Sequence, residues 1–300
     1  MTHLKSKLLA VAFLGVTGCA TVQAPPVQFP AIAEPPTQEH HAGKVIFVEL
    51  VTPDLGDAKR FYGGLFGWTF RDVQGGTRRY ATALVDGRPV AGIFERALPE
   101  TERRRPAWLT YLSTRDVDGA TQLAAKEGAK VLFEPHNLPD RGREAVLADP
   151  QGAVFALLTS STGDPPDVLA ALGEWIWSSL ITFDPAVDAT FYKSLFDYEV
   201  FDLPADRNVT HLMLASDGYA RASANSTPAG ATGVHPHWLN YVRVEDAAAM
   251  AIKVVALGGK VLVEPRVDRH GGKLAVVADP SGAVFGLLEW TDSQTKEVTQ

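Results

Sequence analysis

The chain has 300 residues, of which 46% are hydrophobic and 21% are charged, a composition typical of globular proteins large enough to form two compact domains. Its formal net charge of −7 opposes a general affinity for phosphate backbones, so nucleic acid is excluded as an expected partner. The single cysteine, Cys19, excludes an intramolecular disulfide.

Residues 1–18 are expected to be a signal peptide. Two lysines precede an apolar run from Leu8 to Val16, which is too short to span a hydrocarbon core of about 30 Å. The sequence Val16-Thr17-Gly18-Cys19 resembles the lipobox of bacterial lipoproteins, which implies that Cys19 is acylated and anchors the chain in the cell envelope. Because Ala20 follows the cysteine, the resemblance implies the outer membrane, on its periplasmic side. The alternative is a secreted protein with an incidental cysteine.

Residues 19–43 are expected to form the lipidated cysteine and an extended tether. This stretch is rich in proline and shows no hydrophobic periodicity. In polyproline II geometry it could hold the rest of the chain up to roughly 70 Å from the bilayer. His40 and His41 are interpreted as part of this linker and not as metal ligands.

An internal duplication follows the tether. Phe61-Tyr62-Gly63-Gly64-Leu65-Phe66 recurs as Phe191-Tyr192-Lys193-Ser194-Leu195-Phe196, and the offset of 130 also carries the sequence from Asp149 to Phe155 onto that from Asp279 to Phe285. A register kept over such distances indicates two copies of one domain. We predict domain one over residues 44–159, domain two over residues 174–290 and a C-terminal tail over residues 291–300.

Each domain contains a weaker repeat of its own. Four aspartates follow strand-like runs and precede helical patterns, at an offset of 62 within each domain, and are expected to cap the helices: Asp54, Asp116, Asp184 and Asp246. Short strands separated by turn residues follow each helix. The chain is therefore predicted to be an α+β protein in which each domain consists of two β-α-β-β-β units.

The two motifs Phe-Tyr-x-x-Leu-Phe and Asp-Pro-x-Gly-x-x-Phe resemble those of the vicinal oxygen chelate superfamily. This superfamily includes glyoxalase I, bleomycin resistance proteins and extradiol dioxygenases. The resemblance covers nearly all of residues 44–290 and implies that paired units curl their strands around a cavity.

Metal-dependent members of this superfamily carry ligands on the first and last strands of each unit. The resemblance places the first-strand positions at Phe47, Leu109, Trp177 and Leu239. It places the last-strand positions near Gly92, Ala156, Ser223 and Gly286. A divalent cation needs histidine, cysteine or carboxylate ligands, so we expect neither a metal nor another cofactor.

The side chains that alternate along the first strands are candidates for binding a ligand. They are Phe47, Glu49, Leu109, Tyr111, Trp177, Ser179, Leu239 and Tyr241, together with His211 on a later strand. Aromatic rings with a few polar groups suit a small apolar molecule. Glu49 is the candidate catalytic residue, because a lone carboxylate beside Phe47 would be desolvated and could act as a base or hold a cationic ligand. The alternative is a carboxylate paired with an arginine or reaching solvent.

Three functions remain open from the sequence. The first is an envelope-tethered lipoprotein whose metal-free cavity binds a small apolar or aromatic molecule. The second is an enzyme, a lyase, isomerase or dioxygenase, with a non-standard metal site drawn from residues such as Glu49, His211, His235 and His237. The third is a non-catalytic envelope scaffold. The expected partners are a small molecule and the membrane.

Overall fold

A computed structural model describes residues 29–73, 79–97, 105–203, 210–227, 233–268 and 271–290. Unit one comprises β1 (Val45–Thr52), α1 (Leu55–Phe66), β2 (Thr69–Asp72), β3 (Tyr80–Val85) and β4 (Arg88–Glu95). Unit two comprises β5 (Ala107–Ser113), α2 (Val117–Lys126), β6 (Lys130–Leu138), β7 (Gly142–Ala148) and β8 (Val154–Ser160). Unit three comprises β9 (Trp175–Thr182), α3 (Pro185–Phe196), β10 (Glu199–Asp202), β11 (His211–Ser216) and β12 (Tyr219–Ser226). Unit four comprises β13 (His237–Arg243), α4 (Ala247–Ala256), β14 (Lys260–Val267), β15 (Lys273–Ala278) and β16 (Val284–Leu288).

The predicted α+β class and the four β-α-β-β-β units are confirmed. Units one and two form an eight-stranded sheet in the order β2-β3-β4-β1-β5-β8-β7-β6, and units three and four form a second sheet in the equivalent order β10-β11-β12-β9-β13-β16-β15-β14. Each helix begins after the expected aspartate, whose side chain accepts a backbone N–H of the first turn.

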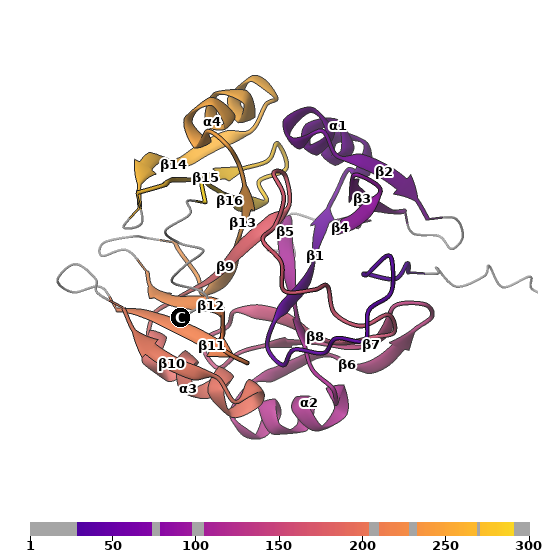
Figure 1. Ribbon diagram of the computed structural model, residues 1–300, viewed down its shortest axis with the longest axis vertical. Helices are drawn as coiled ribbons and strands as arrows, with labels where there is room; N and C mark the ends of the chain where they lie inside the picture. Colours follow the sequence, from indigo (N-terminus) through magenta and orange to yellow (C-terminus); the bar gives the residue numbers. More distant parts are fainter. Residues whose placement is uncertain are drawn as a thin grey trace, which may run out of the picture.

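The helices pack in pairs that join the two domains. Figure 1 shows α1 beside α4 at one end of the molecule and α2 beside α3 at the other. One buried cluster contains Phe61 of unit one and Phe285 of unit four, and a second contains Phe155 of unit two and Tyr192 of unit three. On the helix side, both hydrophobic cores are therefore shared between the two domains.

The two repeated motifs account for part of this junction. The hydroxyl of Tyr62 on α1 donates to Asp279 Oδ2 in domain two at 3.0 Å, and Trp108 Nε1 donates to the Tyr62 oxygen at 3.1 Å. Domain two repeats these contacts in reverse through Tyr192, Asp149 and Trp238, at 3.1 and 3.0 Å. The motif tyrosines thus bind each domain to the turn of the other.

Residues 29–43, called here the N-terminal segment, do not form the free tether expected from their sequence. Ile32 and Ala33 are buried, with exposures of 2% and 6%. The backbone N–H of Thr37 donates to the Thr162 carbonyl, and that of Asp164 donates to the Glu39 carbonyl, each at 2.8 Å. This part of the chain is folded against domain one and the connection between the domains. Cys19, the signal peptide and the C-terminal tail lie outside the described residues.

Candidate functional site

Each sheet has one face covered by helices and one face that we call the inner face. Figure 1 shows the halves of each sheet spreading apart from the central strand pairs β1–β5 and β9–β13, with the helices outside them. The inner faces of the two halves are therefore turned toward each other. The candidate ligand-binding residues on the first strands lie on these faces, because side chains alternate along a strand.

The inner face of domain one is filled. Phe47 and Tyr111 are 5% and 2% exposed, and their ring centroids lie 5.9 Å apart. Leu109 packs against the same cluster, as does Ile32 of the N-terminal segment. The residues expected to line a cavity in domain one do come together, but they contact protein on all sides.

Glu49 is not the lone carboxylate that the sequence suggested. Its Oε2 atom lies 2.9 Å from Arg141 Nη1, and Oε1 accepts a hydrogen bond from the Tyr111 hydroxyl at 3.4 Å. The arginine is fully buried and also donates to the Tyr80 hydroxyl at 2.5 Å. Its guanidinium carbon lies 4.9 Å from the Phe47 ring centroid. The arginine-paired alternative for Glu49 is what the structure shows.

These neighbours keep Arg141 charged. Burial by itself lowers the pKa of a guanidinium, but Tyr80 and Glu49 raise the pKa of Arg141 above its usual value. A second carboxyl, Glu144, is also buried. Its burial, and to a lesser extent repulsion from Glu49, raises the pKa of Glu144 from 4.5 to about 7. Domain one therefore encloses an ion pair beside a carboxyl that is readily protonated.

A divalent metal does not fit this arrangement. Phe47 and Leu109 occupy the first-strand ligand positions, and a side chain at Gly92 would collide with the Tyr80 hydroxyl. Glu49 is paired with a permanent cation, and the neighbouring Glu144 carboxyl is readily protonated. Across the described ranges, no three histidine, cysteine or carboxylate side chains are grouped so that they could hold a metal ion.

Among the described residues, the inner face of domain two carries an aromatic side chain that is less deeply buried than Phe47 of domain one. Trp177 is half-buried, and its indole Nε1 donates to Ser223 Oγ at 3.2 Å. Ser179 Oγ lies 2.9 Å from the same Ser223 oxygen. Tyr241 packs with Leu239 and Leu288, and its ring lies over Gly286, where a Cβ atom would collide with it. Burial raises the pKa of Tyr241 to about 12, so its hydroxyl stays protonated.

The candidates in domain two thus lie together around a small polar centre. His211 on β11 is half-buried and pairs in register with Asn225 on β12. Asn225 Nδ2 donates to Ser223 Oγ at 3.2 Å, whereas its buried Oδ1 atom has no hydrogen-bond partner among the described residues. His237 Nδ1 lies 2.8 Å from the His235 carbonyl oxygen, so these two histidines contact each other.

Sequence reasoning missed Arg141, Tyr80 and Glu144. A comparison of the repeats contained a signal for the ion pair. At the offset of 130, Glu49 corresponds to Ser179 and Arg141 to Gly271, so both charges are present in domain one and both are missing in domain two. The burial of Ile32 could not be predicted in this way, because an apolar residue among prolines is typical of linkers as well.

Comparison with known proteins identifies the fold family. Residues 40–157 match the family model of the glyoxalase/bleomycin resistance protein/dioxygenase superfamily, and residues 180–288 match that of a glyoxalase-like domain. A Mycobacterium tuberculosis protein named as a glyoxylase, CFP32, is 32% identical over 259 residues, which cover 85% of this chain and 98% of the relative. The chain belongs to this superfamily.

Further relatives of this superfamily member differ in their named roles. The anthracycline biosynthesis protein DauV of a Streptomyces species is 31% identical over 268 residues, which cover 82% of this chain and 93% of the relative. Among solved structures, the Mn(II)-bound glyoxalase of Novosphingobium aromaticivorans superposes with a TM-score of 0.59 at 16% identity, covering 83% of each chain. A homoprotocatechuate 2,3-dioxygenase variant of B. fuscum also gives 0.59, at 15% identity, over 88% of this chain and 73% of that one. These structures share the fold of this chain.

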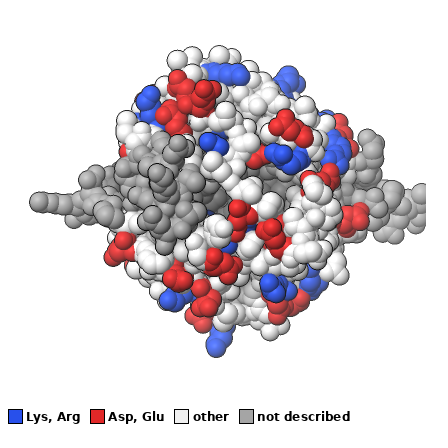
Figure 2. Space-filling view, viewed as in Figure 1, with Lys and Arg blue, Asp and Glu red and all other residues white. Residues whose placement is uncertain are grey.

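The charged side chains on the surface do not indicate a binding site. Figure 2 shows acidic and basic side chains interspersed over the visible face, without an extended basic area among the described residues. No helix in the described part of the chain is long and apolar enough to cross a membrane.

Proposed function

We propose that this superfamily member binds a small hydroxylated aromatic molecule on the inner face of domain two, without a metal. The observation that carries this proposal is the half-buried indole of Trp177 beside the polar centre of Ser179, Ser223 and Asn225. The Trp177 and Trp290 ring centroids lie 6.1 Å apart, so a second indole packs against Trp177 at this face.

The polar centre favours a ligand with a hydrogen-bond donor. Asn225 Oδ1 is buried and accepts no hydrogen bond from a described residue, and an unsatisfied buried acceptor is costly. A phenolic hydroxyl could donate to it while the ring stacks on Trp177. The name of the anthracycline biosynthesis relative agrees with a polycyclic aromatic ligand.

Domain one is not proposed as the site of this ligand. The sequence predicted Glu49 as a catalytic residue on the inner face of domain one, but Ile32 and Arg141 fill that face. The half-buried indole of Trp177 lies in domain two instead.

The test is a fluorescence titration of the purified chain with 2,6-dihydroxyanthraquinone, whose hydroxyls are free to donate. Trp177→Ala is expected to weaken binding at least tenfold, because it removes the stacking surface. Phe133→Ala is the matched control, since Phe133 is 54% exposed on β6 of domain one. Binding should be unchanged after dialysis against a chelator. Equal affinity in Trp177→Ala and the unsubstituted chain would refute the proposal.

A glyoxalase- or dioxygenase-type reaction is the second candidate, favoured by the name of the mycobacterial relative. Conversion of the methylglyoxal–glutathione hemithioacetal, or cleavage of a catechol, can be assayed with and without added Ni²⁺, Zn²⁺, Mn²⁺ or Fe²⁺. Metal-stimulated turnover would favour the enzyme. Absence of turnover with retained aromatic binding would favour the binding protein.

We also propose that Cys19 carries a lipid anchor in the bacterial outer membrane. If so, only residues 20–28 separate the anchor from the packed N-terminal segment. Nine residues span at most about 30 Å, less than half the reach expected for a tether of residues 20–43. The domains would then lie close to the bilayer.

A further inference from the structure

The first part of the N-terminal segment lies where the inner face of domain one would otherwise be open. Ile32 belongs to the buried cluster that contains Phe47 and Tyr111. The Phe29 ring packs edge-on against Tyr80, with the centroids 5.1 Å apart. Arg141 lies between the rings of Phe29 and Phe47, at 5.1 and 4.9 Å from their centroids. An aromatic ring and an aliphatic side chain thus occupy this face as a ligand would.

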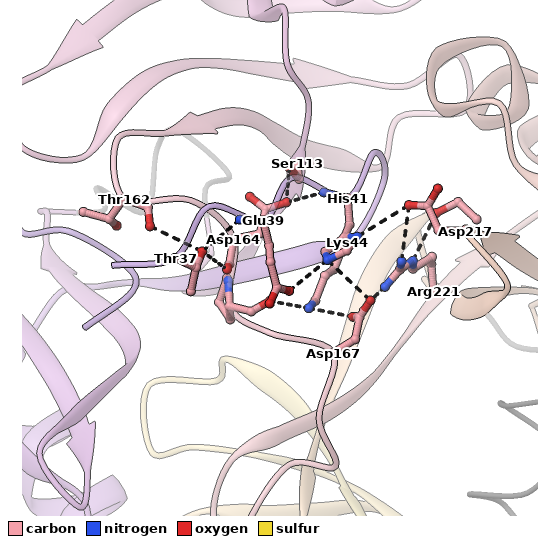
Figure 3. A network of polar contacts seen from close by, with 12 residues as sticks. Thr37, Glu39, His41, Lys44, Ser113, Thr162, Asp164, Asp167, Asp217 and Arg221 are labelled. Atoms are coloured by element: carbon pink, nitrogen blue, oxygen red, sulfur yellow. Dashed lines mark hydrogen bonds and ion pairs between the residues drawn. The ribbon is translucent and has the colours of Figure 1, made fainter. Parts of the chain in front are cut away.

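The two parts of the N-terminal segment are held differently. Residues 37–43 take part in the polar network of Figure 3. In that network His41 N donates to Asp164 Oδ2 at 2.7 Å, and Lys44 Nζ lies 2.7 Å from Asp167 Oδ1. Ser216 Oγ of domain two donates to the Ala42 carbonyl at 2.9 Å. This part is fastened to the connection between the domains and to domain two.

Residues 29–34, called here the plug, have fewer polar contacts. Arg141 Nε donates to the Pro30 carbonyl at 3.3 Å, and the Ala33 N–H donates to Thr162 Oγ1 at 3.3 Å. The remaining contact is an ion pair between Glu34 and Arg71 at 3.0 Å, and both side chains are more than a third exposed. Such exposed pairs contribute little. The plug therefore depends mainly on the burial of its apolar side chains.

In the connection between the domains, the residues that correspond to the plug are not apolar. At the offset of 130, residues 29–33 correspond to residues 159–163, Thr-Ser-Ser-Thr-Gly, which contain no large apolar side chain. The apolar residues that follow in the connection are exposed, with Val168 at 73% and Leu172 at 52%. Among the described residues, the connection therefore does not supply domain two with a counterpart of Phe29 and Ile32.

We propose that the plug is an intramolecular ligand that covers a second, latent binding site on the inner face of domain one. Residues 37–43 stay fastened when the plug leaves. Its departure exposes the guanidinium of Arg141 between the Phe47 and Tyr80 rings and frees the Nε donor that the Pro30 carbonyl now accepts. The latent site accordingly takes an aromatic compound that carries an acceptor oxygen, replacing the Phe29 ring and the Pro30 carbonyl.

The test uses the full chain and the probe 1-anilinonaphthalene-8-sulfonate, an aromatic sulfonate. Ile32→Asp places a carboxylate in the apolar cluster and should release the plug, so that each chain binds one more probe molecule than the unsubstituted chain. Ile252→Asp is the matched control, since Ile252 is 73% exposed on α4, and should add no site. Adding Arg141→Met to Ile32→Asp should remove the additional site.

A milder variant covers the case in which Ile32→Asp does not fold. Glu34→Arg places a like charge opposite Arg71 at the exposed rim and should favour release of the plug without altering the buried cluster. The additional probe site should then appear with an apparent affinity at least threefold weaker than in Ile32→Asp. A synthetic peptide of residues 26–36 should displace the probe from either variant. No additional site in both variants, or an additional site that the peptide does not compete for, would overturn the proposal. Adding Trp177→Ala should leave the additional probe site intact. The test of the latent site in domain one is therefore independent of the test of the proposed ligand site in domain two.

Discussion

Arg141→Met tests whether the buried ion pair holds domain one together. Methionine keeps much of the length of arginine but removes the bonds to Glu49 at 2.9 Å, to the Tyr80 hydroxyl and to the Pro30 carbonyl. Glu49, which is 7% exposed, would be left with a long hydrogen bond to Tyr111. Removing one partner of a buried pair costs about 3–5 kcal/mol, because the other charge stays buried without compensation.

The assay is urea unfolding followed by circular dichroism, with the free energy of unfolding extrapolated to water. Arg60→Met is the matched control, since Arg60 is 74% exposed in its pair with Asp57, and it should change stability by no more than about 0.5 kcal/mol. Adding Glu49→Leu to Arg141→Met removes both charges and should restore most of the loss. A loss below about 1 kcal/mol in Arg141→Met, or a double variant that shows the sum of the single losses, would refute the reasoning.

Three further predictions concern a carboxyl, the domain junction and the anchor. The pKa of Glu144 is raised on folding, so the folded chain binds a proton that the unfolded chain lacks, and stability should fall as pH rises from about 4.5 to 7. In urea titrations Glu144→Gln should flatten this slope, whereas the exposed control Glu134→Gln should not. Tyr62→Phe should lower the free energy of unfolding by about 1–3 kcal/mol, because Asp279 and Trp108 lose a buried hydrogen-bond partner. Tyr192→Phe should lower it by a separate amount, so the two losses should add in the double variant. A double variant whose loss in chemical denaturation differs markedly from the sum would contradict two separate junctions. Cys19→Ser should abolish incorporation of labelled fatty acid and membrane partitioning, and persistence of both would show that the lipoprotein interpretation is wrong.

Local pattern in the sequence was enough to predict the units and their order. The spacing of apolar residues, the capping aspartates and the Asp-Pro-x-Gly turns act within a few residues, so they predict strands and helices wherever the chain later packs. The offset of 130 then identified two copies, and strand alternation placed Phe47, Glu49, Trp177 and Ser179 on one kind of face.

Only the tertiary structure decided what those faces contact. Glu49 meets Arg141 across 92 residues of chain, and Tyr62 meets Asp279 across 217, and no local periodicity encodes such pairings. The same holds for Ile32, whose neighbours in sequence are typical of a linker while its neighbours in space are Phe47 and Tyr111. Burial depends on the whole fold, because a side chain is removed from water by whichever distant segments pack over it. The sequence by itself therefore determined the architecture and the candidate residues, whereas packing between distant segments determined that the inner face of domain one is filled by Ile32 and Arg141.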